Sequence, residues 1–336
     1  MTPPRIAYVG HPDRVSPWLL RAIEQATTFE AICCPDAGEA ARRYRARWSF
    51  DDLDAMLRET EPDGVVLAVG PARRPAMIKQ CLSAGIAVLT PEAPGPASAC
   101  TRLGSIAKLS GRTLLAATPA RYAPSILLAR RLIDSGRISM PVLAALHITR
   151  RGRAREDESD AGCIPSSLAF EAMDLIHHLF DGVDAIACIP QEDAAVGVVR
   201  AAGGVAISLL LHANGAADAE GLHLEIRGRD GSRIVVDADG RLLCGNNSRM
   251  HAAHRPTRLA ADPCVEFGYA GLIDDFCRLL RVGRSNPGMP GAVPAVVASA
   301  EALLASAAKG KSISLTGKAR PRRATAKARS ETAILF

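Results

Sequence analysis

Short apolar runs alternate with amphipathic segments through the first 120 residues, and this alternation limits the possible folds more than any other feature. Runs such as Arg5 to Val9 and Val65 to Val69 have the length and β-branched content of buried strands. The segments between them, such as Pro75 to Ala84, have the period of helices. Strands that alternate with helices form a parallel sheet covered on both faces. Residues 1–120 are therefore predicted to form an α/β, Rossmann-like, doubly wound nucleotide-binding domain.

The pattern changes after a helix predicted from Ile126 to Ser135. Longer runs with alternating apolar residues follow, such as Val142 to Thr149 and Val205 to Ala213, with turn sequences between them. Residues 121–316 are therefore predicted to form an α+β domain with a large, mostly antiparallel sheet. Residues 317–336 are rich in Arg and Lys and are predicted to be a disordered tail.

The charge of the chain gives little reason to expect a nucleic-acid partner. The formal net charge is +6, and the tail contributes +5 of it, so the remaining sequence is nearly neutral. No aromatic residue that would stack on a base lies among the charges of the tail. No apolar run reaches the ~18 residues that span a bilayer, and the start of the chain does not resemble a signal peptide, so we expect a cytoplasmic protein without a membrane partner. Nine cysteines lack paired metal-ligand spacing, so no metal site is expected.

A Glu-x-Pro turn closes the stretch AGIAVLTPEAP, from Ala84 to Pro94. The turn resembles the Glu-Lys-Pro turn of the Gfo/Idh/MocA oxidoreductases, the glucose-fructose oxidoreductase and inositol dehydrogenase family. The segments EPDGVVLAVGP, RYAPSILLARRLIDSGRI and GLIDDFCRLLRVG are also similar to segments of that family, in the same order. The resemblance covers about residues 5 to 316. It implies a pyridine-nucleotide oxidoreductase that acts on a sugar, an inositol or a related polyol.

The residues at the implied catalytic positions differ from those of the family. The lysine position is Ala93, whose methyl group cannot donate a proton or hold a charge. The family's Asp-x-x-x-His-x-x-Asp run corresponds to Ser167, Glu171 and Asp174, so only the last acid is retained. Glu171 would act as a general base if burial raised its pKa, or it would line the site with Asp174 to hold a polyol. A helix with a polar face and no chemical role is an equal alternative.

The cofactor-binding residues implied by the resemblance also depart from the usual pattern. The turn GHPDRV retains Gly10 but has Pro12 and Val15 in place of the other two glycines. NAD or NADP would then depend on side chains, whereas a nucleotide fold that no longer binds nucleotide is an equal alternative. A preference for NADP has no support. The candidate cofactor contacts are Gly10, His11, Arg14, Asp36, Glu92 and Pro94.

Four residues are candidates for contact with the small-molecule substrate. Arg74 stands where the family often has a histidine near the nicotinamide, and its guanidinium would bind an anionic group. Arg121 and Tyr122 lie at the predicted domain junction, where Tyr122 is alternatively a core residue. His178 lies four residues after Asp174 and is a candidate partner for it.

Three functions are compatible with these residues. The first is a divergent oxidoreductase-like protein that binds a small polar ligand, sugar-like, polyol-like or acidic, in the interdomain cleft, with dehydrogenase activity weak or lost. It would instead catalyse a non-redox step if Glu171 acted as a base. The second is a non-catalytic partner or ligand-sensing subunit that forms a homo-oligomer or binds another protein through the second sheet, as the resemblance implies. The third is an NAD(P)-dependent sugar or polyol dehydrogenase with relocated catalytic groups.

Overall fold

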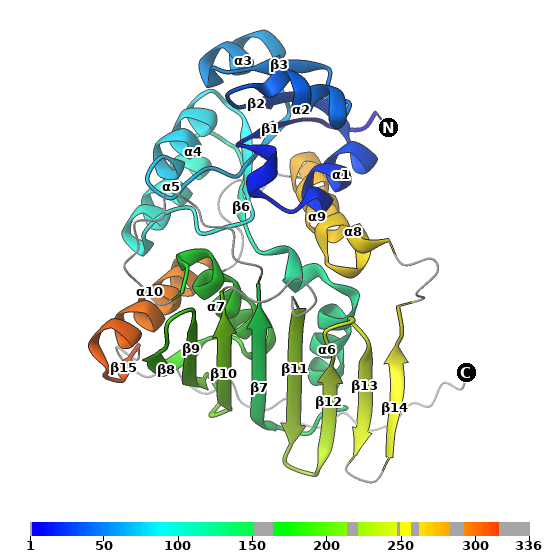
Figure 1. The fold of residues 1–336 in the computed structure, drawn as a ribbon, viewed down its shortest axis with the longest axis vertical. Helices are drawn as coiled ribbons and strands as arrows, with labels where there is room; N and C mark the ends of the chain where they lie inside the picture. Colours follow the sequence, from blue (N-terminus) through cyan, green and yellow to red (C-terminus); the bar gives the residue numbers. More distant parts are fainter. Residues whose placement is uncertain are drawn as a thin grey trace.

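The structure, a computed structural model, describes residues 2–150, 164–213, 221–246, 249–256, 262–282 and 292–315. It consists of two sheets with helices around them (Figure 1). The predicted basic tail, residues 317–336, lies outside the described residues. Among the helices of the described ranges, none is long and apolar enough to cross a membrane.

Six parallel strands form the first sheet, in the order β3-β2-β1-β4-β5-β6. The strands and the helices that cover the sheet are β1 (Arg5–Val9), α1 (Pro17–Ala26), β2 (Thr28–Cys33), α2 (Ala37–Arg43), β3 (Trp48–Phe50), α3 (Leu53–Thr60), β4 (Gly64–Leu67), α4 (Arg74–Ser83), β5 (Ala87–Thr90), α5 (Ala97–Leu109) and β6 (Leu114–Ala116). All residues of β4 and β5 are buried, as expected for strands covered on both faces. The order is that of a Rossmann fold and reverses between β1 and β4.

One strand of this domain has a weak sequence signal. Helix α2 ends at Arg43, and the short strand β3 follows it at the edge of the sheet. Trp48 in β3 is 56% exposed, so this strand lacks the buried apolar run by which the others are recognised.

The second sheet has nine strands, in the order β14-β13-β12-β11-β7-β10-β9-β8-β15. Only the pair of β7 and β10 is parallel. Its elements are α6 (Pro124–Asp134), β7 (Pro141–Thr149), α7 (Ser166–Phe180), β8 (Val183–Pro190), β9 (Ala194–Ala201), β10 (Ala206–His212), β11 (Gly221–Gly228), β12 (Ser232–Val236), β13 (Leu242–Asn246), β14 (Arg249–His254), α10 (Val293–Lys309) and β15 (Ile313–Ser314). The predicted fold class is confirmed, although β8, β9, β13 and β14 were not expected.

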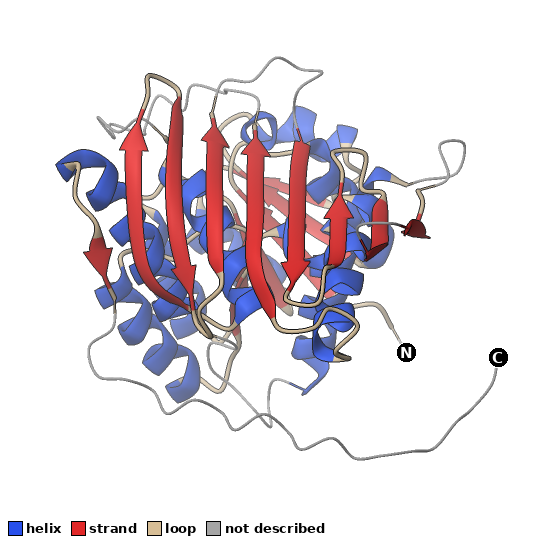
Figure 2. Cartoon of the chain, turned by 90° about the horizontal axis from the view of Figure 1, so that it is seen from below, coloured by secondary structure: helices blue, strands red, loops and turns tan. Residues whose placement is uncertain are grey.

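Within the described residues, helices cover one face of the second sheet and leave the other face uncovered. Apolar residues of α7 and α10 form a common core with the inward residues of the strands, such as Leu146, Ile207 and Val199. The opposite face of the strands is open in Figure 2, where no helix lies in front of it. The alternating burial of β9 and β10 fits this arrangement, since every second residue faces away from the core.

The last helices of the chain pack on different domains, one on the first sheet and one on the second. The short helix α8 (Pro263–Glu266) leads into α9 (Tyr269–Val282), which packs beside α1 on the first sheet (Figure 1). Leu272, Ile273 and Phe276 of α9 belong to the same core as Ile6 and Leu19. Helix α10 then packs on the second sheet. The chain therefore crosses between the domains more than once, which couples them mechanically.

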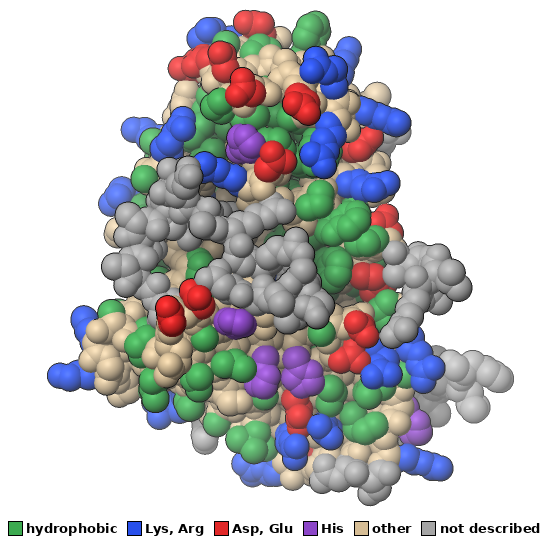
Figure 3. Space-filling model, in the orientation of Figure 1, with side chains coloured by type: hydrophobic (Ala, Val, Ile, Leu, Met, Phe, Trp, Pro, Cys, Tyr) green, Lys and Arg blue, Asp and Glu red, His purple; other side chains and the backbone are tan. Residues whose placement is uncertain are grey.

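Acidic and basic side chains are interspersed on the face shown in Figure 3, and no extended surface of one sign is visible there. A basic stripe is the usual electrostatic sign of a nucleic-acid site. The described part of this face has no such stripe.

Candidate functional site

The candidate site lies where the carboxyl ends of the first sheet meet the second domain. In doubly wound sheets, ligands bind beyond the carboxyl ends of the strands, near the point where the strand order reverses. Here that point lies between β1 and β4. Ala93, just after β5, packs against the core of the second domain, and Thr118, just after β6, is hydrogen-bonded to α7. Helix α7 therefore faces this edge of the first sheet.

Gly10 follows β1 at the reversal point, and the backbone there requires a glycine. Its φ is 141°, and a Cβ atom would lie 2.2 Å from the carbonyl oxygen of Ala68. The Gly10 N–H donates to the carbonyl of Cys33 at 3.0 Å. Gly10 therefore keeps the tight turn that the first glycine of a dinucleotide-binding motif provides.

The rest of this turn differs from a phosphate-binding loop. Pro12–Arg14 forms a single 3-10 turn, η1, with His11 at its N-cap, and α1 begins only at Pro17. Pro12 and Pro17 have no N–H to offer a phosphate. Helix N-termini bind anions through such N–H groups, so two of the possible donors are absent.

Asp36 is exposed and lies three residues beyond the end of β2. It occupies the N-cap position of α2 with φ of 58°, but its side chain makes no capping hydrogen bond. Its predicted contact with a ribose stays a prediction.

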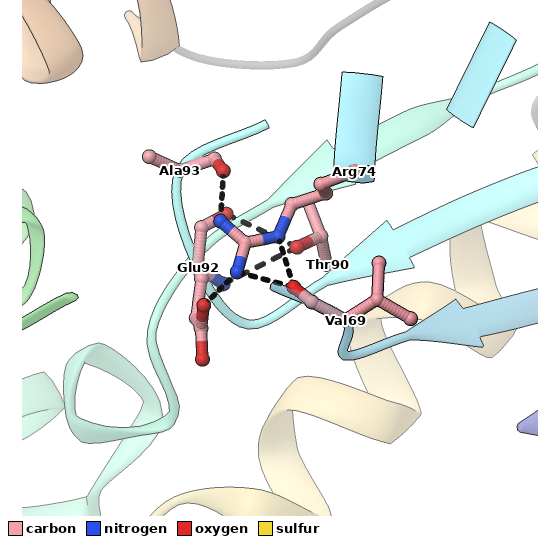
Figure 4. A network of polar contacts seen from close by, with 5 residues as sticks. All are labelled: Val69, Arg74, Thr90, Glu92 and Ala93. Carbon is pink, nitrogen blue, oxygen red and sulfur yellow. Dashed lines mark hydrogen bonds and ion pairs between the residues drawn. The ribbon is translucent and has the colours of Figure 1, made fainter. Parts of the chain in front are cut away.

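Arg74 holds the Glu-x-Pro turn in place through hydrogen bonds and an ion pair, as Figure 4 shows. Arg74 begins α4 and is only 3% exposed. Its guanidinium donates to the carbonyls of Val69, through Nη2 at 2.7 Å, and of Ala93, through Nη1 at 2.7 Å. It also forms an ion pair with Glu92. Arg74 therefore connects the end of β4 to the turn after β5.

Glu92 and Pro94 are buried, whereas Ala93 is half-buried. The Thr90 hydroxyl donates to the Glu92 carbonyl at 3.2 Å and fixes the turn from the strand side. Because the side chain of Ala93 is a methyl group, the position offers no group that transfers a proton.

Asp174 of α7 joins the two domains. It is 1% exposed, and its carboxylate accepts from the N–H and the hydroxyl of Thr118, both at 2.9 Å, and from Arg121 at 2.8 Å. Burial raises the pKa of Asp174, while Arg121 and the Thr118 hydrogen bonds oppose this effect. The partners satisfy the carboxylate within the protein, so we assign Asp174 a structural contact.

His178 lies one turn further along α7, next to the same arginine. Arg121 Nη2 lies 3.4 Å from His178 Nδ1, and since arginine only donates, Nδ1 is the acceptor and Nε2 carries the hydrogen. Burial, together with Arg121 and Arg130, lowers the pKa of His178 to about 4, so the ring is neutral at physiological pH. Nε2 is buried and has no hydrogen-bond partner among the described residues.

Glu171 and Ser167 lie on the preceding turns of α7. Arg150, the residue after β7, binds both carboxylate oxygens of Glu171. Its Nε donates to Oε2 at 3.0 Å, and its Nη2 makes a second ion-pair contact. A bidentate guanidinium uses one lone pair of each carboxylate oxygen and fixes the orientation of the group. Ser167 is half-buried near the start of the helix.

Tyr122 points away from α7. Its hydroxyl donates to Asp275 of α9 at 2.8 Å, and burial, with Asp275, raises its pKa. This contact fits the alternative of a core residue that fixes η2 (Pro119–Tyr122) against α9.

A small pocket of about 180 Å³ opens beside Arg121. It is lined by Arg121, His177, Asp181, Ala292, Val293 and Val296. No cluster of three metal-ligating side chains occurs in the part of the chain that the structure describes.

The structure thus brings Arg121 beside both Asp174 and His178. The helical spacing suggested only that Asp174 and His178 lie on one face of α7. The structure also pairs Arg74 with Glu92, which the sequence does not indicate. Sequence reasoning also missed Thr118 and the role of Arg150, because both depend on contacts between distant segments.

No protein-family model matches the sequence, and no curated protein matches it. Solved structures with the same fold are numerous. An oxidoreductase from Agrobacterium radiobacter, in complex with NAD⁺, L-tartaric acid and magnesium, is 15% identical, with 93% of this chain and 98% of that chain covered and a TM-score of 0.75. Levoglucosan dehydrogenase, in complex with NADH and L-sorbose, is 16% identical, with 94% and 100% covered and a TM-score of 0.75. GenD2 from gentamicin A biosynthesis, in complex with NAD, is 18% identical, with 94% and 97% covered and a TM-score of 0.76.

The chain therefore has the fold of Gfo/Idh/MocA-type dehydrogenases over nearly its whole length, which confirms the resemblance seen in the sequence. At such low identity the likeness shows the fold alone.

Proposed function

We propose that the chain is a divergent Gfo/Idh/MocA-type protein that binds a small, neutral, polar ligand between its domains and has weak or no dehydrogenase activity. The fold supports a ligand site at the carboxyl ends of the first sheet. The chemistry of the residues at that site argues for the loss of ordinary hydride transfer.

The observation that carries the proposal is the turn around Ala93. Hydrogen bonds and an ion pair of Arg74, Glu92 and Thr90 hold the backbone of the turn in place. At Ala93 the turn carries a methyl group where the family has an acid–base group. General acid–base catalysis contributes about 10²–10⁴-fold to a rate, so its loss alone makes turnover slow. Glu171 is a poor replacement because Arg150 grips its carboxylate.

The charges of the site favour a neutral ligand over an acidic one. Three arginines near the site each lie beside a carboxylate: Arg74 beside Glu92, Arg121 beside Asp174 and Arg150 beside Glu171. An anionic ligand would have to compete with these carboxylates for the guanidinium groups. Hydroxyl groups of a sugar or polyol would instead hydrogen-bond to groups whose charge is already balanced.

The cofactor site fits a dinucleotide only in part. Gly10 provides the tight turn after β1, whereas Pro12 and Pro17 remove N–H donors. We propose that NAD(H) or NADP(H), if it binds, is held more weakly than a complete turn would hold it, with His11 and Arg14 as side-chain contacts. A bound nicotinamide would supply the hydride acceptor.

Energy transfer from tryptophan to reduced nicotinamide tests this part of the proposal. The only tryptophans are Trp18, on α1, and Trp48, on β3, and both lie in the first domain. We expect titration with NADH or NADPH to saturate only well above the micromolar range. Arg14→Gln should weaken binding further, while Arg45→Gln, which changes a highly exposed arginine of the same domain, should not. Saturation at micromolar NADH would contradict the weakened site.

The open face of the second sheet supports a second candidate function, association of this chain with a second copy. Exposed apolar residues gather there: Leu143, Ile189, Val196, Val198 and Leu210. Nine strands at ~4.8 Å spacing, each with about six residues at ~3.4 Å, give roughly 900 Å² of sheet. This area is comparable with the ~800 Å² that each partner buries in a stable interface.

Light scattering of the full chain tests the association. We expect a species larger than the monomer, and Leu210→Asp should dissociate it because a charge would be buried in the contact. A wild-type protein that remains a monomer at all accessible concentrations would contradict this candidate.

A further inference from the structure

We propose that two histidines on the open face of the second sheet, His147 and His223, make association of two copies of this chain dependent on pH, so that acidification separates them. This inference rests on the association proposed above. It adds a regulatory property of the interface that the ligand site does not require.

The two histidines face each other directly. His147 of β7 is paired with His223 of β11, and their ring centroids are 5.7 Å apart. The neighbours of His147 along β7, Leu146 and Ile148, are buried in the core. Since side chains alternate along a strand, His147 points to the open face.

The pair continues a row of apolar side chains across the sheet. Strand register places Ile189 beside Val196, Val196 beside Leu210, Leu210 beside His147, and His147 beside His223. The three apolar members are 66%, 49% and 39% exposed. A partner that covered this row would also cover the histidines at its end.

The remaining titratable and charged groups on this part of the face do not offset a positive charge on the histidines. Two acidic groups lie near the pair, and each already has an arginine partner. Glu225 of β11 is bonded to Arg227 and Arg233, and Asp237, the residue after β12, is bonded to Arg241. His212 lies on β10, two residues beyond Leu210, and Arg200 lies on β9 at the far end of the face. No described helix packs over these strands on this side (Figure 2). Protonation therefore adds positive charge next to a surface that is already weakly positive.

Contact between two copies would bury the histidine pair of each copy and remove water from it. Burial, with His223 as a neighbour, already lowers the pKa of His147 in the single chain. Further burial in an interface lowers it more, because the charged form loses hydration. The associated form then binds fewer protons than the separate chains, so a fall in pH favours separation.

Sedimentation velocity of the full chain at pH 7.5, 6.5 and 5.5 tests the proposal. Two associated copies contain two His147 side chains that cannot bind a proton in the interface. Below the pKa, each of them changes the association equilibrium by up to tenfold per pH unit. We therefore expect the dissociation constant to rise at least about tenfold from pH 7.5 to 5.5. The double variant His147→Gln, His223→Gln should associate at pH 7.5 and should lose this dependence. Near-ultraviolet circular dichroism at each pH establishes that the chains stay folded.

His251→Gln is the matched control. His251 is an exposed histidine on β14 and pairs with Cys244, whose side chain packs toward the core side of the sheet, so it lies off the open face. This variant should keep the wild-type pH dependence. Association with the same dissociation constant at every pH would overturn the histidine proposal and leave the interface standing. A similar loss of association on acidification in the double variant would also overturn it, and a monomer throughout would overturn the interface as well.

Discussion

At the scale of single residues, the site is notable for arginines that hold carboxylates. Arg74 lies where the resemblance implied a histidine near the nicotinamide, and it binds Glu92 and the carbonyl of Ala93 instead of standing ready for a ligand. An ion pair this well buried contributes little net free energy, but removal of one partner leaves the other charge without compensation. The role of Arg74 is therefore to position the turn and not to bind a ligand.

Replacement of Arg74 by methionine should destabilise the protein by about 3–5 kcal/mol, because Glu92 would remain buried without its partner. Urea unfolding at neutral pH measures the change. The double variant Arg74→Met, Glu92→Gln should recover a large part of the loss. Arg73→Met is the control, since Arg73 is exposed, and it should change stability by less than about 0.5 kcal/mol. Equal effects of Arg73→Met and Arg74→Met would refute the assigned role.

At the scale of elements, the approach of α9 to η2 holds the domain junction. Gly268 precedes α9 with φ of 82°, and a Cβ atom there would lie 2.0 Å from the carbonyl oxygen of Pro119. Tyr122 of η2 reaches Asp275 of α9 in the same contact. The geometry of the junction therefore depends on the absence of a side chain at residue 268.

Gly268→Ala should lower the free energy of unfolding by more than about 3 kcal/mol, because it adds a clash with backbone to the cost of a positive φ. Gly136→Ala provides the comparison. Gly136 has a similar φ of 73° but nothing within 4 Å of its Cβ position, so it should cost only about 1 kcal/mol. Denaturation of both variants measures the difference, and equal losses would show that the close approach is unimportant.

The strands that are fully buried were the easiest to predict from the sequence. Strands such as β4 were found from sequence because all their residues are buried and nearly all are apolar. Strands β8 and β9 were missed because they carry apolar residues on both faces, as at Ile189 and Val198, which obscures the alternation. The helical spacing predicted that Asp174 and His178 share a face, but Arg150 is 21 residues from Glu171 along the chain, and no local pattern reveals such a pair.

At the scale of the whole molecule, two domains are joined where a dehydrogenase of this fold would have its site. Thr118, at the end of the first domain, and Arg121, at the junction, both bind Asp174 of the second domain, so the junction is part of the site itself. The fold is retained over nearly the full length, while the proposed chemistry differs at Ala93 and Glu171. The architecture therefore persists in a chain whose residues at the family's catalytic positions differ.

The initial rate of NADH formation, followed by absorbance, tests the loss of hydride transfer. The wild-type protein and the Ala93→Lys variant are each assayed with high NAD⁺ and a panel of neutral polyols. Typical enzymes turn over at about 10 s⁻¹, and the missing acid–base group predicts a wild-type rate at least about 100-fold lower. A gain in Ala93→Lys would show that the rest of the site still supports hydride transfer. Wild-type turnover near 10 s⁻¹ on any polyol would contradict the proposed loss and establish a dehydrogenase with relocated catalytic groups.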